Sequence, residues 1–387
     1  MSRARSIKRD ESGAWMFVVD LTPPGGTRKQ VRRRGYRTKA EAQEGLDVVK
    51  GQAKAGTYVE PSRDRVGAYL LRWVDTLPAA GRKPSTVDSY RQYVTRYLVG
   101  TPVGDTALQS LGALQLDELF AAMLGRGLSA RTVRYLHAIV GKALGDAERK
   151  GLVVRNVTRL ADPPTSKATR APEHTIWTPV ELRSFLDHVN GHRHDTVVWL
   201  AALTGLRRGE LCGLRWTDID LDVGTLRVRQ AVSVTQPTVA GKRTTELHVG
   251  DAKTARSRRT VDLDAGTVTR LRDHRWAMLE ERLKMGAGFT DAGFVFCRPD
   301  GSAWNPDTIS QAFDRLVASS DLPRVRFHDL RHGHASHMLA AGVNPKVVSD
   351  RLGHASVSFT LDVYAHVMPG QQRDAADLVA DLIFGAP

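Results

Sequence analysis

A proline-rich segment near the middle of the chain separates two parts that we expect to fold independently. The segment Ala161–Pro172 holds Pro163, Pro164 and Pro172 among small and basic residues. Proline fixes its φ angle and has no amide N–H, so this segment can form neither a long helix nor a central strand. We therefore predict a linker over residues 163–172, with one folded part before it and another after it.

Positive charge is the strongest signal in the composition. The chain has 56 Lys and Arg residues against 42 Asp and Glu, a formal charge of +14, and a pI near 10. Such an excess favours a polyanionic partner, most simply nucleic acid, because neutralised phosphates release counterions. A basic protein without such a partner stays an open alternative. A basic hinge between two lobes would suit a protein that closes around a duplex.

Several other classes of protein do not fit the sequence. Cys212 and Cys297 are too few for a disulfide framework or a cysteine-rich zinc site. No apolar run is long enough to span a bilayer. Residues 1–10 are basic, but no apolar core follows them, so they are not a secretory signal. We expect a cytoplasmic protein that associates with DNA.

Residues 1–60 predict a small basic module. Thr38 and Glu41 form a capping box, which marks the start of a helix. Residues 1–40 contain eleven Lys and Arg against three Asp and Glu, so the module could contact DNA. The predicted elements are a strand, a turn, a returning strand and a helix, at 15–19, 23–26, 29–32 and 39–55. The candidate DNA-binding residues are Arg32, Arg33, Arg34 and Arg37.

Residues 61–162 predict a bundle of four or more helices. Apolar residues recur at helical spacing over 63–77, after a cap at Ser85, over 116–124 and over 129–150. Basic residues recur beside hydroxyl side chains on the exposed side, where they could bind phosphates or simply be solvated. The candidate DNA-binding residues of this part are Arg82, Lys83, Arg91, Arg131 and Arg134.

Residues 173–387 hold the candidate chemistry. Thr178 and Glu181 form a capping box, and an apolar helix over 196–203 ends at Gly205. Arg207 follows this stop, and Glu210, three residues on, is within reach to orient it. Strands are predicted at 225–228, 245–249 and 259–263, and helices at 265–283 and 306–319. The turn before the last strand carries the cations Lys253, Arg256 and Arg258, and the two arginines are further candidate DNA-binding residues.

The stretch from His328 to Tyr364 adds imidazoles, an arginine and a tyrosine. His328 and Arg331 are three residues apart, so a helix would place them on one side. Gly342 and Gly353 stand where helices would end. Zinc is the rival interpretation, because His328 and His332 have i, i+4 spacing. A zinc site is disfavoured because no Glu follows the first histidine and no cysteine is near. The surplus histidines His332, His334 and His337 are expected to be scaffold.

Five elements together resemble the tyrosine recombinases, also called the phage integrase family. They are Thr204–Glu210, the hairpin Lys253, His328-x-x-Arg331, Leu352-Gly353-His354 and Tyr364. The resemblance covers residues 173–370 by motif and 1–160 by domain layout. It implies a multidomain, mainly α fold with small β elements. The expected domains are a sheet-plus-helix arm-binding module (1–60), a helical core-binding bundle (61–162) and an α+β catalytic domain (173–387).

The resemblance also implies a role for each motif residue. Tyr364 would be the nucleophile that forms a 3′-phosphotyrosyl intermediate, and Lys253 would be the general acid. Arg207 and Arg331, with permanent charge and forked donors, would bind the non-bridging oxygens of the phosphate. His328 would assist deprotonation of the tyrosine, and His354 would add a hydrogen bond. Glu210 would orient this cluster. With these fixed cations no cofactor or metal ion is expected.

The favoured function is a site-specific recombinase that integrates or excises a mobile element. The expected partners are core and arm DNA sites, three further copies of the chain in a tetramer, and an excisionase or a host DNA-bending protein. A type IB topoisomerase would share the tyrosine chemistry but not the arm module. A non-catalytic DNA-binding relative would lack a nucleophile or an arginine, and none is missing. The apolar tail 375–384 would pack on a neighbouring protomer or on its own domain.

Overall fold

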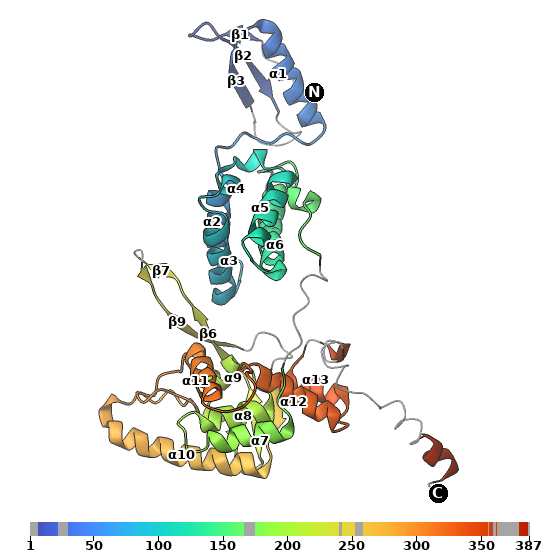
Figure 1. The fold of residues 1–387 in the computed structure, drawn as a ribbon. Helices are drawn as coiled ribbons and strands as arrows, with labels where there is room; N and C mark the ends of the chain where they lie inside the picture. The colour runs from blue at the N-terminus through green and yellow to red at the C-terminus, as the bar shows by residue number, and fades with distance from the viewer. Residues whose placement is uncertain are drawn as a thin grey trace. The chain divides into compact units, whose positions relative to one another are not determined.

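The structure is a computed structural model that divides into two compact units, residues 1–170 and 171–387 (Figure 1). It describes residues 7–21, 30–165, 175–239, 242–251, 258–354, 356–358, 361 and 379–385. Three predicted site residues, Lys253, Arg256 and Tyr364, and most of the predicted linker lie outside these ranges. The three-domain division stays a prediction.

The first unit begins with the predicted sheet and helix. Strands β1 (Lys8–Arg9), β2 (Trp15–Asp20) and β3 (Gln30–Tyr36) form an antiparallel sheet in that order. Helix α1 (Lys39–Lys54) packs on it. The small core consists of apolar side chains from both layers: Phe17, Val19, Val31, Leu46 and Val49.

The predicted start of α1 is confirmed with one change in the bonding. The hydroxyl of Thr38 accepts a hydrogen bond from the amide of Glu41 at 3.1 Å. The carboxylate of Glu41 in turn accepts from the amide of Arg37 at 2.9 Å. The glutamate therefore binds the N–H of the residue before the capping residue, and not that of the capping residue itself as in a standard capping box.

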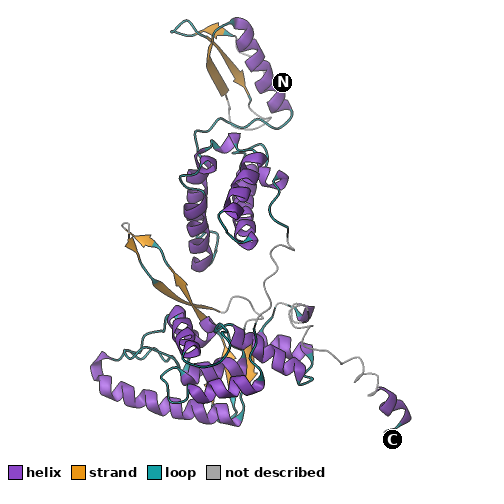
Figure 2. Cartoon of the chain, viewed as in Figure 1, coloured by secondary structure: helices purple, strands orange, loops and turns teal. Residues whose placement is uncertain are grey.

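A helical bundle follows in the same unit (Figure 2). Its helices share one buried core and are α2 (Val66–Thr76), α3 (Pro84–Tyr97), α4 (Pro102–Asp105), α5 (Ala113–Gly125) and α6 (Ala130–Arg149). The predicted cap at Ser85 is wrong, because Lys83 precedes the helix and Pro84 takes its first position. Proline fits there, since its φ angle suits the helix and its missing N–H would have no partner.

The second unit is built around helix α8 (Asp195–Thr204), which packs against α7, α10 and α12. Most side chains of α8 are buried, as its unbroken apolar run predicts. Further helices of this unit are α7 (Pro179–His188), α9 (Arg208–Gly213), α10 (Ala265–Met285), α11 (Pro306–Ala318), α12 (Asp329–Ala340) and α13 (Pro345–Leu352). The capping box of Thr178 and Glu181 is present at the start of α7.

Small antiparallel sheets complete the second unit. Strands β4 (Ile219–Asp220), β5 (Thr225–Val228) and β10 (Arg259–Asp262) pair in the order β10-β5-β4. A hairpin of β6 (Gln230–Thr235) and β9 (Glu246–Asp251) carries the short pair β7 (Thr238–Val239) and β8 (Lys242–Arg243). The predicted mainly helical class with small β elements is confirmed. Among the described residues, no helix is long and apolar enough to cross a membrane.

Candidate active site

The end of α8 makes a close contact that only glycine permits. Gly205 has a φ of +64°, the left-handed region that side chains disfavour. A Cβ atom there would lie 2.5 Å from Leu352 Cδ2 and 2.9 Å from His334 Cδ2. The missing side chain thus lets α8 end directly against α12 and α13. The helix end predicted at Gly205 is confirmed.

Arg207 stands between α8 and α9 and is oriented by Glu210. Its Nη1 donates to Glu210 Oε1 at 2.8 Å, and its backbone N–H donates to Oε2 at 2.9 Å. Its Nη2 donates to the carbonyl of Gly353 at 3.2 Å. The side chain of Arg207 stays 39% exposed, whereas that of Glu210 is 5% exposed. The contact predicted from the i, i+3 spacing is present, and it leaves one side of the guanidinium open to solvent.

Arg331, on α12, is buried beside the same turn. Only 4% of the residue is exposed. Its two Nη atoms donate to the carbonyls of Gly205 and Leu352, each at 2.7 Å. Main-chain acceptors at the ends of α8 and α13 therefore hold this guanidinium in one orientation.

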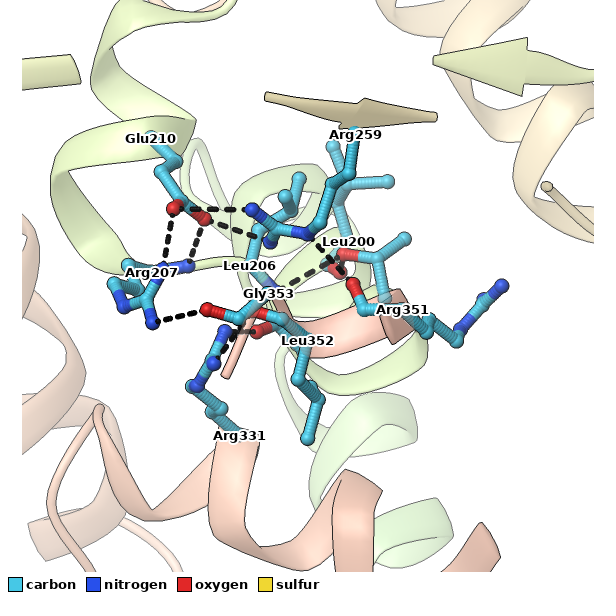
Figure 3. A network of polar contacts seen from close by, with 11 residues as sticks. Leu200, Leu206, Arg207, Glu210, Arg259, Arg331, Arg351, Leu352 and Gly353 are labelled. Atoms are coloured by element: carbon cyan, nitrogen blue, oxygen red, sulfur yellow. Dashed lines mark hydrogen bonds and ion pairs between the residues drawn. The ribbon is translucent and has the colours of Figure 1, made fainter. Parts of the chain in front are cut away.

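Arg259 is a member of this network that the sequence interpretation missed. It begins β10, and its guanidinium donates to both oxygens of Glu210 (Figure 3). Burial alone would raise the pKa of Glu210, but the hydrogen bonds and charge of Arg259, with the charge of Arg207, lower it below its usual value. Glu210 is thus an ionised carboxylate between two arginines. The only sequence signal was one arginine among several near a hairpin tip.

The carboxyl end of α13 collects one hydrogen bond from each arginine. The carbonyls of residues 351, 352 and 353 accept from Arg259 (2.6 Å), Arg331 (2.7 Å) and Arg207 (3.2 Å), respectively. The last carbonyls of a helix have no partner within the helix and carry partial negative charge, so cations suit them. The predicted helix stop at Gly353 is where the three arginines meet.

Two histidines of the predicted set lie beside the arginines. His354 is 8% exposed, and burial together with the charges of Arg331 and Arg207 lowers its pKa to about 3. His328 immediately precedes α12 and is exposed at its surface. Partial desolvation and the charge of Arg331 lower the pKa of His328 as well. Near neutral pH His354 is therefore an uncharged donor or acceptor, and His328 favours its neutral form.

His334 links scaffold elements. Its Nδ1–H donates to the carbonyl of Ala202 at 3.0 Å, and its Nε2 accepts from Arg351 Nε at 3.2 Å. Arg351 also donates to the carbonyls of Leu203 and Asp262. These bonds tie α12 and α13 to α8 and β10, in keeping with the scaffold role expected for the surplus histidines. Within the described ranges, no three His, Cys, Asp or Glu side chains are grouped to hold a metal ion.

The candidate DNA-binding residues differ in how they are held. In β3, Arg32 and Arg34 are exposed, whereas Arg33 donates to the hydroxyl of Tyr58 at 3.2 Å. Arg33 sits on the opposite side of the strand, because neighbouring side chains alternate between faces. In the bundle the basic residues Arg82, Lys83 and Arg131 are exposed. Three others already contact protein groups: Arg91 with Asp75, Arg134 with the carbonyl of Pro164, and Arg258 with Asp251.

Comparison with known proteins identifies the family. Residues 177–370 match the phage integrase family, and residues 6–53 match an arm DNA-binding domain. The first match spans half of the chain and contains Arg207, Arg331 and His354. The chain therefore belongs to the phage integrase family, and it is a tyrosine recombinase.

Relatives match nearly the whole chain. It is 27% identical over 385 residues to a tyrosine recombinase XerC-like protein of Caldanaerobacter subterraneus subsp. tengcongensis, covering 97% of this chain and 95% of the relative. It is 26% identical over 392 residues to the ICEBs1 integrase of Bacillus subtilis, covering 98% and 100%.

Solved structures share the fold. The Tn1549 transposon integrase bound to a circular intermediate DNA has a TM-score of 0.66 at 20% identity, covering 82% of this chain and 100% of that one. A lambda integrase tetramer bound to a Holliday junction has a TM-score of 0.55 at 17% identity, covering 91% and 96%. The predicted tyrosine recombinase fold is confirmed.

Proposed function

We propose that this recombinase cuts and rejoins DNA at specific sites with Tyr364 as the nucleophile. One observation carries the proposal. Two arginines from distant segments, Arg207 before α9 and Arg331 on α12, are held at the same turn by Glu210 and by main-chain carbonyls. Such a pair provides fixed positive charge for one phosphate, and donors fixed in advance stabilise charge that develops in a transition state.

The arginines would stabilise the phosphate while the phenol attacks. The oxygen of Tyr364 would form a bond to phosphorus, and the bond from phosphorus to the 5′-oxygen would break. A 3′-phosphotyrosyl link would remain, and the 5′-oxygen would take a proton from Lys253. The 5′-hydroxyl of a partner strand would later reverse these steps. Energy is retained in the covalent link, so no cofactor is needed to reseal the strand.

The histidines would act as neutral groups. Burial and nearby arginine charge keep the pKa of His354 at about 3, so its imidazole would donate a hydrogen bond without adding charge. His328 also favours its neutral form, because its pKa is lowered. A neutral imidazole can accept a proton, so His328 would assist deprotonation of the phenol.

The expected partners fit the division of the chain. The module with exposed Arg32, Arg34 and Arg37 would bind arm sites, and the bundle with Arg82, Lys83 and Arg131 would bind a core half-site. The likeness to the lambda integrase tetramer supports assembly of four copies on two DNA sites. An excisionase or a host DNA-bending protein would set the direction. A DNA partner of this kind would place the protein in the cytoplasm.

A covalent-trapping experiment tests the nucleophile. A nicked core-site duplex loses the short 5′ fragment after cleavage, so the covalent complex accumulates. Wild-type protein should become attached to this DNA, and Tyr364→Phe should bind the duplex without attachment. Attachment should proceed equally in EDTA, as the metal-free chemistry requires. Attachment by Tyr364→Phe would overturn the assignment, and strong inhibition by EDTA would overturn the metal-free mechanism.

A further inference from the structure

We propose that Arg259 is a positioning residue for strand cleavage. It would hold Glu210 and the carboxyl end of α13 so that Arg207, Arg331 and His354 face one phosphate together. This inference rests on the proposed function, since it assigns a role within the same site. Arg259 would act through these neighbours and would not touch the reacting atoms.

Arg259 joins two segments that are distant in sequence. Its side chain is 6% exposed. Its Nη1 and Nη2 donate to Glu210 Oε1 and Oε2 at 3.2 and 2.9 Å, while its Nε donates to the carbonyl of Arg351 at 2.6 Å. Bidentate contact of this kind fixes direction as well as distance, because the guanidinium is planar. One rigid group thus sets the spacing between α9 and the end of α13.

Glu210 needs both arginines to keep its orientation. Each carboxylate oxygen accepts two hydrogen bonds, one from Arg207 and one from Arg259. This number fills the acceptor capacity of a carboxylate. Without Arg259 the buried Glu210 would keep half of its bonds and one neighbouring charge. The carboxylate would then rotate or take up a proton, and either change would free the Arg207 side chain to leave its present orientation.

The end of α13 depends on the same residue. Arg259 binds the carbonyl of residue 351, directly before the carbonyls that bind Arg331 and Arg207. His354 is the next residue of the chain. A shift of this turn would therefore move the acceptors of both other arginines and the imidazole at once. Lysine could not replace Arg259, because one ammonium group cannot serve three acceptors in a plane.

If Arg259 had a purely structural role, its replacement would lower stability without a specific loss of cleavage. Arg270 provides the matched control for that alternative. The side chain of Arg270 is 22% exposed and pairs with Asp195 at 3.3 Å. It lies over the ring of Trp199 and donates to Asn190. These contacts lie at the start of α8, whereas the arginine cluster lies at its end. Arg270→Lys should therefore lower the melting temperature without changing cleavage.

The test compares Arg259→Lys, Arg270→Lys and wild type in the full chain. Three quantities are measured: thermal unfolding, affinity for a core half-site, and the single-turnover rate of covalent attachment to the nicked duplex. For Arg259→Lys we expect a rate about 100-fold lower, the effect of misplacing catalytic groups by about 1 Å, with half-site affinity within about threefold. Arg270→Lys should attach at close to the wild-type rate. Equal rates for Arg259→Lys and wild type, or an equal loss in Arg270→Lys, would overturn the inference.

The pH profile and a double variant separate positioning from stability. In Arg259→Met the pKa of Glu210 should rise, so the attachment rate should fall toward acid pH more steeply than in wild type. Glu210→Gln combined with Arg259→Met should be less slow than the product of the two single losses, because both variants break the contact between Arg259 and Glu210. Fully additive losses would contradict action through Glu210.

A measurement without cleavage distinguishes failure of this inference from failure of the proposed function. Hydrogen exchange of the amides in 349–354 should quicken in DNA-free Arg259→Lys and stay unchanged in Arg270→Lys. Unchanged exchange in Arg259→Lys would overturn the link to α13. Failure of the wild-type protein to attach would overturn the proposed function alone.

Discussion

The molecule uses arginine in two opposite ways. In the second unit Arg331 and Arg259 are buried and bound to carbonyls or to Glu210. In the helical bundle Arg82 and Arg131 are exposed. A buried guanidinium held in one orientation is costly to desolvate, but it needs no reorganisation when a phosphate binds. An exposed guanidinium is screened and mobile, and it contributes mainly through counterion release.

The difference teaches that the position of an arginine predicts the kind of effect it has. Loss of a fixed arginine should lower the rate of the chemical step, because its donors are aimed before DNA binds. Loss of an exposed arginine should lower affinity and its salt dependence, with the chemical step unchanged. The experiments below test this separation.

The largest effect is expected for Arg331. Arg331→Ala should lower the single-turnover attachment rate by a factor of about 10² to 10³ or more, as for loss of a preorganised donor. It should also destabilise the fold, because the carbonyls of Gly205 and Leu352 lose their donor in a buried place. Arg331→Lys keeps the positive charge but lacks the forked donors of the guanidinium, so its attachment rate should be little higher than that of Arg331→Ala. A rate close to wild type in Arg331→Lys would show that charge alone suffices.

Acid should destabilise the second unit more than the first. Of the 13 histidines of the chain, one, His137, lies in residues 1–170. Burial, helped by arginine charge, lowers the pKa of His334 to about 4 and that of His354 to about 3. Between these values and the ordinary 6.5 the unfolded chain binds more protons than the folded one, so the free energy of unfolding falls as the pH is lowered through this window.

The expected fall in the free energy of unfolding is on the order of 1–2 kcal/mol for each imidazole between pH 6.5 and 5. Hydrogen exchange at pH 7.5 and pH 5, corrected for the intrinsic rates, should show lost protection in α8 and α12 and little change in α6. His334→Gln should weaken the pH dependence of α8. Equal losses in α6 and α8 would contradict the explanation.

The smallest effect is expected on the exposed face of the bundle. Arg131→Gln should lower the slope of log affinity against log salt by about one, the value for a single phosphate contact. Arg91→Gln should change the slope less, because Arg91 is already paired with Asp75. Both variants should attach to saturating nicked duplex at the wild-type rate. A slower attachment by Arg131→Gln would contradict the view that exposed arginines affect affinity and only fixed arginines affect the rate of attachment.

The sequence predicted the local features of this molecule well. Caps at Thr38 and Thr178, and the stops at Gly205 and Gly353, depend on neighbouring residues, and all are present. The wrong cap at Ser85 has a local cause too, since Pro84 directly before it suits the first position of the helix.

Features that need tertiary structure were less predictable. Arg207 and Glu210 are three residues apart, so their contact follows from helix geometry. Arg259 meets Glu210 across 49 residues, and Arg207 meets Gly353 across 146. No periodicity or spacing rule selects Arg259 from the other cations near that hairpin. The candidate site residues could thus be proposed from a sequence motif, but the network that orients those in the described ranges could not.

The bonds at the carboxyl end of α13 have a consequence for how the protein is made. The three carbonyls can be filled only after β10, α12 and the segment between α8 and α9 have come together. During synthesis this cannot happen until residues 351–353 have emerged from the ribosome. A chain that ends before this turn therefore holds Arg207 and Arg331 without the carbonyls of Gly353 and Leu352 that bind them. Competence to cut DNA would therefore arise only after the chain has been made through this turn.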